Sequence, residues 1–341
     1  MKNKFINLKP FFIAEISGNH GGNISNAKKL IDAAKHGGAD AVKLQTYTPD
    51  MMTLKPNENK YKIKHGLWKN LDLWNLYKKA QTPISWHKEL FNYARKKKIK
   101  IFSSPFSEQA VDILESLNCE VYKVSSFEMN DLNLIKKIAK TKKPMIISTG
   151  LASLKEINLT LKVAKKYGCK DITLLYCVSN YPSNLKDFNL NNLEIIKKKF
   201  NTRVGFSDHS IGSALSCMAI IKGAEVIEKH ICLKNIKAVD SKFSLKENDI
   251  RSFSDDIKNA YCLIKNKTFT RSKEELKNKI FRRSIFAITD IKKGTKFTKK
   301  NIKTFRPAIG LSSSHFLRIL NKKSPYNIIK GQPLSSRLKK I

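Results

Sequence analysis

Residues 203–233 read RVGFSDHSIGSALSCMAIIKGAEVIEKHICL and indicate the kind of fold that this chain adopts. Arg203–Ser210 and Glu225–Leu233 are short β-prone runs, and Ser213–Lys222 between them has the pattern of a helix. A strand, a helix and a second strand in this order form a parallel β-α-β unit. The two strands of such a unit end at the same edge of a sheet, so the polar residues that follow them are expected to be neighbours.

The same alternation extends over the first 265 residues. The predicted strands are Phe11–Ser17, Ala41–Thr46, Ile99–Phe106, Glu120–Ser126, Pro144–Gly150, Ile172–Asn180, Arg203–Ser210 and Glu225–Leu233. The predicted helices are Asn26–His36, Trp86–Lys97, Glu108–Leu117, Leu132–Ala139, Lys155–Tyr167, Asn192–Lys199, Ser213–Lys222 and Asn248–Ile264. Eight strands that alternate with eight helices are typical of an α/β protein with a (β/α)8 TIM barrel. A doubly wound sheet is the alternative, but nothing like GxGxxG follows the first strand.

The C-terminal part of the chain differs in composition from the barrel. A polar, lysine-rich stretch at 266–279 predicts a linker between a barrel domain at 1–265 and a small domain at 280–341. Within the small domain, Asp290–Phe297 and Asn327–Leu334 resemble each other, as two copies of a β-turn-β unit would. We therefore expect a compact, β-rich domain that is too small to host the chemistry alone.

The charge of the chain is strongly positive: 66 basic and 28 acidic residues give a formal net charge of +38. Only nine of the basic residues are arginines, the side chain that nucleic-acid readers prefer. The lysines are spread over nearly every helical segment, which is typical of a solvated surface. This distribution argues against a nucleic acid as partner, although the positive field would still favour small anionic substrates.

Nothing in the sequence indicates a membrane or an oxidising compartment. No apolar run approaches the ~18 residues that a membrane span needs, and Glu15 interrupts the apolar stretch that begins at Phe11, which argues against a signal peptide. The six cysteines show neither CxxC nor metal-binding spacing. We expect reduced, buried thiols and a cytoplasmic location.

Polar residues stand at the end of every predicted strand, where TIM barrels build their active sites. They include Glu15, Lys43, Gln45, Ser104, Lys123, Ser126, Ser148, Ser179, Tyr181, Ser207, Asp208, His209, Glu228 and His230. An unpaired buried charge costs several kcal/mol. A purely structural core would therefore not place charged groups in all these runs.

Lys43 and Lys123 alternate with apolar neighbours, as residues that point into a barrel do. Three interpretations are open. Each lysine could pair with a buried acid such as Glu15, or the two could hold a small polyanion such as a phosphate that carries a carboxylate. Alternatively, Lys123 could form a Schiff base, as in barrel aldolases. Two lysines among several hydroxyls favour the anion.

Two histidines predict a metal site. His209 and His230 are 21 residues apart, at the ends of adjacent strands. Two imidazoles with open positions and carboxylates nearby suit a divalent ion that stays partly hydrated, Mn²⁺ above all, with Mg²⁺ or Co²⁺ as alternatives. His20, beside Gly21 and Gly22, is interpreted as a loop organiser or a substrate contact.

A long segment, Asp50 to Ser85, separates the second strand from its helix and contains Trp68 and Trp74. Loops of this length in a barrel form active-site walls or contacts between subunits.

Several of these motifs resemble those of a known family. They are Ala14–His20, Lys43–Tyr47, Ser104–Phe106, Ser148–Gly150, Ser207–His209 and Glu228–His230. In order and spacing they resemble the sialic acid synthase family over nearly the whole chain. The segment with Arg306-Pro307 and Gly310-Leu311 resembles the antifreeze-protein-like (SAF) domain of that family.

Within the family, three stretches resemble the pseudaminic acid branch: Gly66–Trp68, Thr82–His87 and Asp240–Leu245. The chain also departs from the family pattern. Lys234 stands where an acid is typical, the connection from His230 to Asp240 is slightly short, and Gly18 replaces a more usual alanine. The first two departures lie near the expected sugar site.

The resemblance implies a condensation of phosphoenolpyruvate with an N-acetylated amino sugar, which gives a nine-carbon 2-keto acid and phosphate. For the pseudaminic branch the sugar is 2,4-diacetamido-2,4,6-trideoxy-altrose. An N-acetylneuraminate or legionaminic acid synthase, with another sugar and the same reaction, is the nearest alternative. A Schiff-base aldolase is a more distant one.

The resemblance also implies roles for particular residues. His209 and His230 would hold the divalent metal ion, and Glu15 would handle a proton. Phosphoenolpyruvate would be held by Lys43, Lys123, Ser126, Ser148 and Ser207. The sugar site would be lined by Gln45, Ser104, Tyr181 and Asp240, with Ser179 as a further substrate contact. Asp208 would join the catalytic group formed by Glu15, Lys43 and Lys123.

Finally, the resemblance implies a homodimer. The small C-terminal domain would reach the partner's active site and offer Arg306 to its sugar.

Overall fold

The computed structural model describes residues 5–340 except 8, 56–61, 65–68, 70, 182 and 267. The chain divides into two compact units, Met1–Lys265 and Asn266–Ile341, which are described separately. The stretch expected as a linker belongs to the second unit and contains a short helix, α11 (Lys273–Lys277). Ser272 caps this helix by accepting a hydrogen bond from the backbone N–H of Glu275.

The first unit is a closed barrel of eight parallel strands, which confirms the fold expected from the sequence. Its strands are β1 (Phe11–Glu15), β2 (Ala41–Thr46), β3 (Lys100–Pro105), β4 (Tyr122–Val124), β5 (Met145–Ser148), β6 (Ile172–Tyr176), β7 (Arg203–Asp208) and β8 (Val226–Cys232). Each pairs with the next, and β1 also pairs with β8. A two-residue strand, β9 (Leu245–Lys246), extends the sheet beside β8.

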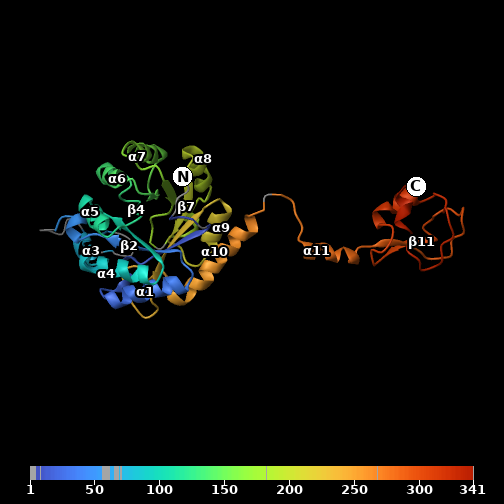
Figure 1. The fold of residues 1–341 in the computed structure, drawn as a ribbon, viewed down its shortest axis with the longest axis horizontal. Coiled ribbons are helices and arrows are strands. Elements are labelled where there is room, and N and C mark those ends of the chain that lie inside the picture. Colours follow the sequence, from blue (N-terminus) through green and yellow to red (C-terminus); the bar gives the residue numbers. More distant parts are fainter. Residues whose placement is uncertain are drawn as a thin grey trace. The chain divides into compact units, whose positions relative to one another are not determined.

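Helices surround the strands in this unit (Figure 1). They are α1 (Ile24–His36), α4 (Ile84–Lys96), α5 (Glu108–Ser116), α6 (Leu132–Lys140), α7 (Leu154–Lys166), α8 (Asn191–Phe200), α9 (Ala214–Ile221) and α10 (Ile250–Ile264). Several begin at a side-chain cap, and α7 has a full capping box between Ser153 and Glu156. None of the helices among the described residues has the length and apolar character needed to cross a membrane.

The long segment after β2 adds two short helices above the barrel. They are α2 (Pro49–Met52) and α3 (Leu73–Ala80), and α4 follows after only three residues. The Gly66–Trp68 motif lies outside the described residues.

The second unit contains a two-stranded antiparallel sheet, β10 (Ser284–Ala287) and β11 (Ile302–Phe305). The internal repeat appears as a reciprocal exchange of hydrogen bonds. The Asp290 side chain accepts from the Lys330 backbone N–H at 2.8 Å, and the Asn327 side chain accepts from the Lys293 backbone N–H at 2.7 Å. The glycine of each copy has a positive φ, +87° at 294 and +86° at 331, which favours glycine.

Candidate active site

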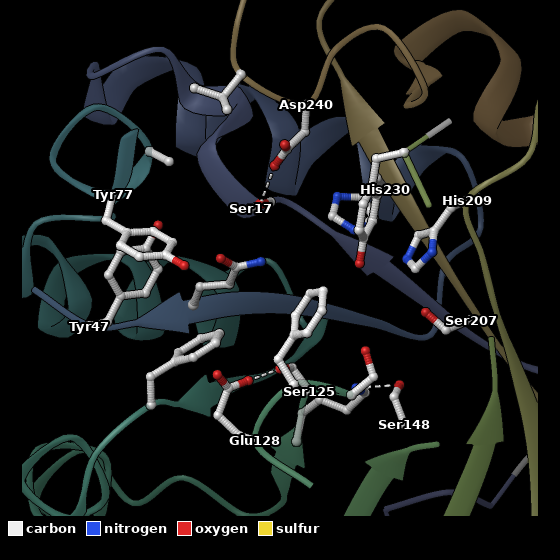
Figure 2. Close-up of a pocket in the computed structure, with 18 of the residues that line it drawn as sticks. Ser17, Tyr47, Tyr77, Ser125, Glu128, Ser148, Ser207, His209, His230 and Asp240 are labelled. Carbon is white, nitrogen blue, oxygen red and sulfur yellow. Dashed lines mark hydrogen bonds between the residues drawn. The ribbon is translucent and has the colours of Figure 1, made fainter. Parts of the chain in front are cut away.

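A cavity of about 420 Å³ opens at the carboxyl ends of the barrel strands. Its floor is polar and charged, while α2, α3 and the strand-end aromatics give it an apolar side. Figure 2 shows Tyr47 and Tyr77 on one side and His209, His230 and Ser207 on the other. The long segment between β2 and β3 thus forms a wall of the cavity, one of the two roles expected for it.

Two buried lysines and two buried glutamates form the floor. Lys43 Nζ lies 2.9 Å from Glu15 and 3.2 Å from Glu228, and Lys123 Nζ lies 3.9 Å from Glu228. Burial disfavours the charge of Lys43, but Glu15 and Glu228 raise its pKa above the ordinary value. Burial also acts against the charge of Glu228, yet Lys123 and Lys43 hold its pKa below the usual value. The floor is therefore a compensated charge cluster.

The other two members of the cluster have pKa values near neutrality. Burial raises the pKa of Glu15 to about 7, against the opposing effect of Lys43. Gln45 donates a hydrogen bond to Glu15 at 3.1 Å. Burial lowers the pKa of Lys123 to about 8, and Lys43 adds to this effect. A carboxyl group poised near pH 7 is suited to proton transfer.

Hydroxyl groups surround Lys123 on one side of the cavity. Its ammonium donates to Ser148 Oγ at 2.7 Å and to the Val124 carbonyl at 2.9 Å. Ser126 and Ser179 share a hydrogen bond of 2.8 Å close by. Gly150 makes this contact possible, because a Cβ atom there would lie 2.2 Å from Ser179 Oγ and 2.8 Å from Ser126 Cβ.

His209 and His230 face each other across one side of the cavity, with ring centroids 5.5 Å apart. His209 Nδ1 lies 2.9 Å from the Val178 carbonyl, which places the ring hydrogen on Nδ1 and leaves Nε2 as an acceptor. His230 Nδ1 is buried and has no hydrogen-bond partner among the described residues. Burial lowers the pKa of His209 to about 4 and that of His230 well below its usual value.

These two side chains fit a metal site with open positions. Neutral imidazoles with unshared lone pairs are the form that binds a metal ion. Among the described residues, no His, Cys, Asp or Glu completes a group of three. The two imidazoles alone are a donor set that suits an ion whose remaining positions are filled by water and substrate.

Asp240 lies at the rim of the cavity, where it accepts a hydrogen bond from Ser17 Oγ at 2.5 Å. Burial raises the pKa of Asp240, and the Ser17 hydrogen bond opposes the shift. The Tyr181 ring packs against His209 in a tilted arrangement with a centroid distance of 4.4 Å, and Phe243 contacts the rings of both. The rim thus combines one carboxylate with aromatic faces, a composition suited to a sugar.

The structure places most predicted residues at the cavity, but Asp208 is a correction. Its carboxylate is directed away from the cavity and is engaged by Lys229 at 2.9 Å, by Ser216 at 2.7 Å and by Ser210. It cannot reach a substrate in the cavity. Side chains alternate along a strand, so the residue between Ser207 and His209 points outward.

Four other predicted residues lie outside the cavity lining. Ser104 is buried beneath it, 3.4 Å from Lys43 Nζ, and Ser179 supports Ser126. Glu15 is fully buried below Lys43. Arg306 belongs to the second unit, where its side chain is exposed after β11.

The sequence reasoning gave no role to Glu228, which lies between both lysines. The alternation along β8 was the available signal, since Glu228 and His230 share one face of the strand. Tyr47, directly after β2, and Tyr77, on α3, were also missed as lining residues. No periodicity predicts that α3 folds over the strand ends.

The fold agrees with comparisons to known proteins. The NeuB family model matches residues 30–268, and a SAF domain model matches residues 282–336. The pseudaminic acid synthase of Campylobacter jejuni is 42% identical over 96% of this chain and 95% of its own. The N,N'-diacetyllegionaminic acid synthase of the same species is 37% identical over 92% of this chain and 95% of its own.

Among solved structures, the N-acetylneuraminic acid synthetase of Leptospira borgpetersenii, in complex with citrate, is similar with a TM-score of 0.70. It is 28% identical, and the match covers 80% of this chain and 90% of that chain. The family match spans most of the barrel, and the sequence similarity extends over nearly the whole chain. This chain belongs to the NeuB family.

Proposed function

We propose that this protein condenses phosphoenolpyruvate with 2,4-diacetamido-2,4,6-trideoxy-altrose to give pseudaminic acid and inorganic phosphate. One observation carries the proposal: two buried lysines and two neutral histidines with available ring nitrogens line the same cavity. The lysines suit an anion, and the histidines suit a metal ion that faces an aldehyde. The similarity to a pseudaminic acid synthase over 96% of the chain names the product.

The lysine side of the cavity would hold phosphoenolpyruvate. Lys123 and the hydroxyls of Ser126, Ser148 and Ser207 offer donors for its phosphate and carboxylate. Lys43 adds charge from below, where Glu15 and Glu228 hold it in place. The paired glutamates keep both ammonium groups fixed before the anion arrives, which lowers the cost of ordering on binding.

His209 and His230 would hold a divalent ion, for which Mn²⁺ is our first choice. When bound, such an ion supplies Lewis-acid polarisation of the sugar aldehyde. The residues around it orient the reactants. The rings of Tyr181 and Phe243 exclude water from the histidine side, and the Val178 carbonyl holds His209 in one tautomer.

Glu15 would move the proton in the reaction. C3 of phosphoenolpyruvate forms the bond to the aldehyde carbon, and the aldehyde oxygen takes a proton and becomes a hydroxyl group. Water adds to C2, and the C–O bond to phosphate then breaks and leaves a ketone at C2. The water gives up a proton as it adds. Glu15, with a pKa of about 7, would take this proton up through Lys43 Nζ, which lies 2.9 Å from Glu15 and lines the cavity where Glu15 does not. Gln45, whose amide reaches Glu15, would connect this group with the sugar.

The identity of the sugar is the finer part of the proposal. The sequence identity is 42% to the pseudaminic acid synthase and 37% to the legionaminic acid synthase. The cavity offers Leu73, Leu76 and Tyr77 on α3 as an apolar wall. Such a wall suits a deoxy sugar, whose C6 is a methyl group, better than the hydroxylated chain of N-acetylmannosamine.

We further propose that the working unit is a cytoplasmic homodimer in which Arg306 reaches the sugar of the partner subunit. In the second unit, Ile280, Phe281, Phe305 and Ile309 are exposed apolar side chains near Arg306 in the chain. At the rim of the cavity, Phe127 is also more than half exposed. Apolar surface of this kind is typical of an interface. All six cysteines are free thiols, in agreement with a reducing compartment.

The experiment that tests the function is phosphate release from phosphoenolpyruvate with added Mn²⁺. The diacetamido-trideoxy-altrose, N-acetylmannosamine and a legionaminic acid precursor are compared side by side. Release with the first sugar alone supports the proposal, and release with only another sugar moves the protein to that branch. Borohydride added during turnover tests the Schiff-base alternative, because only that mechanism attaches substrate covalently to Lys123.

A further inference from the structure

The corner between α3 and α4, residues 80–83, fixes the position of the apolar wall. Leu73, Leu76, Tyr77 and Ala80 of α3 line the cavity, and α3 ends at Ala80. The position of this wall relative to the strand ends therefore depends on the position of the corner. Three sets of buried contacts hold it.

The first contact is a close approach of backbones. A Cβ atom at Gly18 would lie 3.0 Å from the Ala80 carbonyl oxygen and 3.1 Å from its Cα atom. Glycine at this position lets the end of α3 lie directly on the loop after β1. The adjacent Ser17 holds Asp240 at the sugar rim, so the contact links both sides of the sugar site.

The second contact is made by His20. The Gly22 backbone N–H donates to His20 Nδ1 at 3.1 Å, so the ring hydrogen resides on Nε2. Nε2 lies 3.2 Å from Thr82 Oγ1 and donates to it. His20 is fully buried and does not line the cavity, which favours the loop organiser over the substrate contact, the two roles expected for it.

The third contact is made by His87, in the first turns of α4. Its Nδ1 donates to the Pro83 carbonyl at 3.1 Å, and its Nε2 accepts from Thr46 Oγ1 at 2.9 Å. Thr46 ends β2 and also bonds Ser103 on β3 at 2.6 Å. The corner is thereby tied to two barrel strands. His87 and Thr46 are fully buried.

Burial lowers the pKa of His20 to about 4 and lowers that of His87. Both rings are therefore neutral at physiological pH. A neutral imidazole has one donor and one acceptor, and each ring uses both in the pattern described.

We propose that His20 and His87 are positioning residues for the sugar: they hold residues 80–83 against the strand ends and so set the place of the α3 wall. This inference rests on the proposed function. It assigns these residues no contact with substrate and no part in phosphoenolpyruvate binding, since neither lines the cavity.

Two matched substitutions of one residue test the proposal. His20→Asn keeps an acceptor near Nδ1 for Gly22 but is too short to reach Thr82. His20→Gln places an amide N–H near the position of Nε2 and keeps the bond to Thr82. A buried polar group that loses its hydrogen-bond partner destabilises the conformation that depended on the bond. We therefore expect His20→Asn to raise the sugar KM by roughly tenfold, with the phosphoenolpyruvate KM nearly unchanged and His20→Gln close to wild type.

Thr82→Val removes the other partner of the same bond and serves as the second variant. In the double variant His20→Asn/Thr82→Val, the effects on sugar KM should be far from additive. If His20→Asn does not fold, Thr82→Val replaces it as the test variant. Thr53→Val, a substitution of the same kind outside the corner, is then its control.

A second readout is independent of the sugar. Lys78 and Lys79 are exposed on α3 beside the corner, so limited trypsin digestion should cut there faster in His20→Asn and Thr82→Val than in wild type. A wild type that turns over none of the sugars defeats the proposed function, while the trypsin result still tests the corner. Unchanged cleavage and sugar KM in His20→Asn would overturn the inference. So would equal losses in His20→Asn and His20→Gln, or an equal rise in both substrate KM values.

Discussion

At the scale of single residues, the site depends on groups that compensate one another inside the barrel. Lys43 and Lys123 are almost fully buried, and Glu15 and Glu228 supply the opposite charges. Breaking such a cluster by removing one member leaves an uncompensated buried charge. The two glutamates fix the positions of both ammonium groups. An anion that binds in the proposed site would therefore meet ordered charges, and not only the positive field of the whole chain.

The metal assignment leads to the first prediction. His209→Ala and His230→Ala should each abolish turnover, because each removes one of the two proposed ring ligands. Calorimetric titration with Mn²⁺ should show binding to wild type and a loss of at least tenfold in affinity in either variant. His36→Ala, at the exposed end of α1, is the control. Full Mn²⁺ affinity in both variants would remove the assignment.

The second prediction concerns pH and Lys123. Burial lowers the pKa of Lys123 to about 8, so the free protein loses this positive charge as the pH rises above 8. A bound anion stabilises the charged form and raises that pKa. kcat/KM for phosphoenolpyruvate, which reports the free enzyme, should fall roughly tenfold per pH unit above 8, whereas kcat should fall at higher pH.

Lys123→Arg provides the comparison for this profile, because a guanidinium stays charged throughout the range. The kcat/KM of this variant should not decrease above pH 8. The prediction concerns the shape of the pH profile and not the absolute activity of the variant. The same fall in Lys123→Arg would assign the titration to another group.

At the scale of elements, short segments between strands and helices bring the polar groups together. The loop after β5 carries Gly150, which lets Ser126 and Ser179 meet from the ends of β4 and β6. The strand boundaries predicted from periodicity lie within a few residues of those observed, and Ala41–Thr46 is reproduced without change. Which loops touch was not predictable, since contacts between loops leave no periodic pattern.

Gly150→Ala is the third prediction. The added methyl group would overlap Ser179 Oγ and Ser126 Cβ, so the two hydroxyls must separate. We expect the phosphoenolpyruvate KM to rise by roughly tenfold or more through misplaced donors, with far-ultraviolet circular dichroism unchanged. Unaltered phosphoenolpyruvate binding in Gly150→Ala would show that this serine pair does not hold the substrate.

At the scale of the whole molecule, the two units differ in what they contain. The barrel has the cavity and the charge cluster, while the second unit has a small core around Phe297 and Leu334 and an exposed arginine, Arg306. A 62-residue domain, 280–341, with 16 basic and one acidic residue is far more basic per residue than the chain as a whole. Such a domain is suited to meeting an anionic reactant.

The proposed sharing of the site between two subunits leads to the fourth prediction. Arg306→Ala should raise the sugar KM far more than the phosphoenolpyruvate KM. If Arg306 serves the partner's cavity, subunits of Arg306→Ala and of an inactive Lys123→Ala protein should complement each other. After mixing and subunit exchange, half of the dimers are mixed and each has one intact site, so about a quarter of wild-type activity should return. No recovery in a mixture shown to have exchanged would place Arg306 at its own chain's cavity or at none.

The sequence by itself determined the barrel, the repeat in the second unit and most of the polar strand ends. Strand and helix periods are local properties, and residues that share a period share a face. Only the tertiary structure decided which of these side chains meet. It turned Asp208 toward Lys229, placed Glu228 between the lysines and folded α3 over the cavity. The physical reason is that a side chain's partners come from distant strands and loops, so burial and charge compensation are properties of the closed barrel.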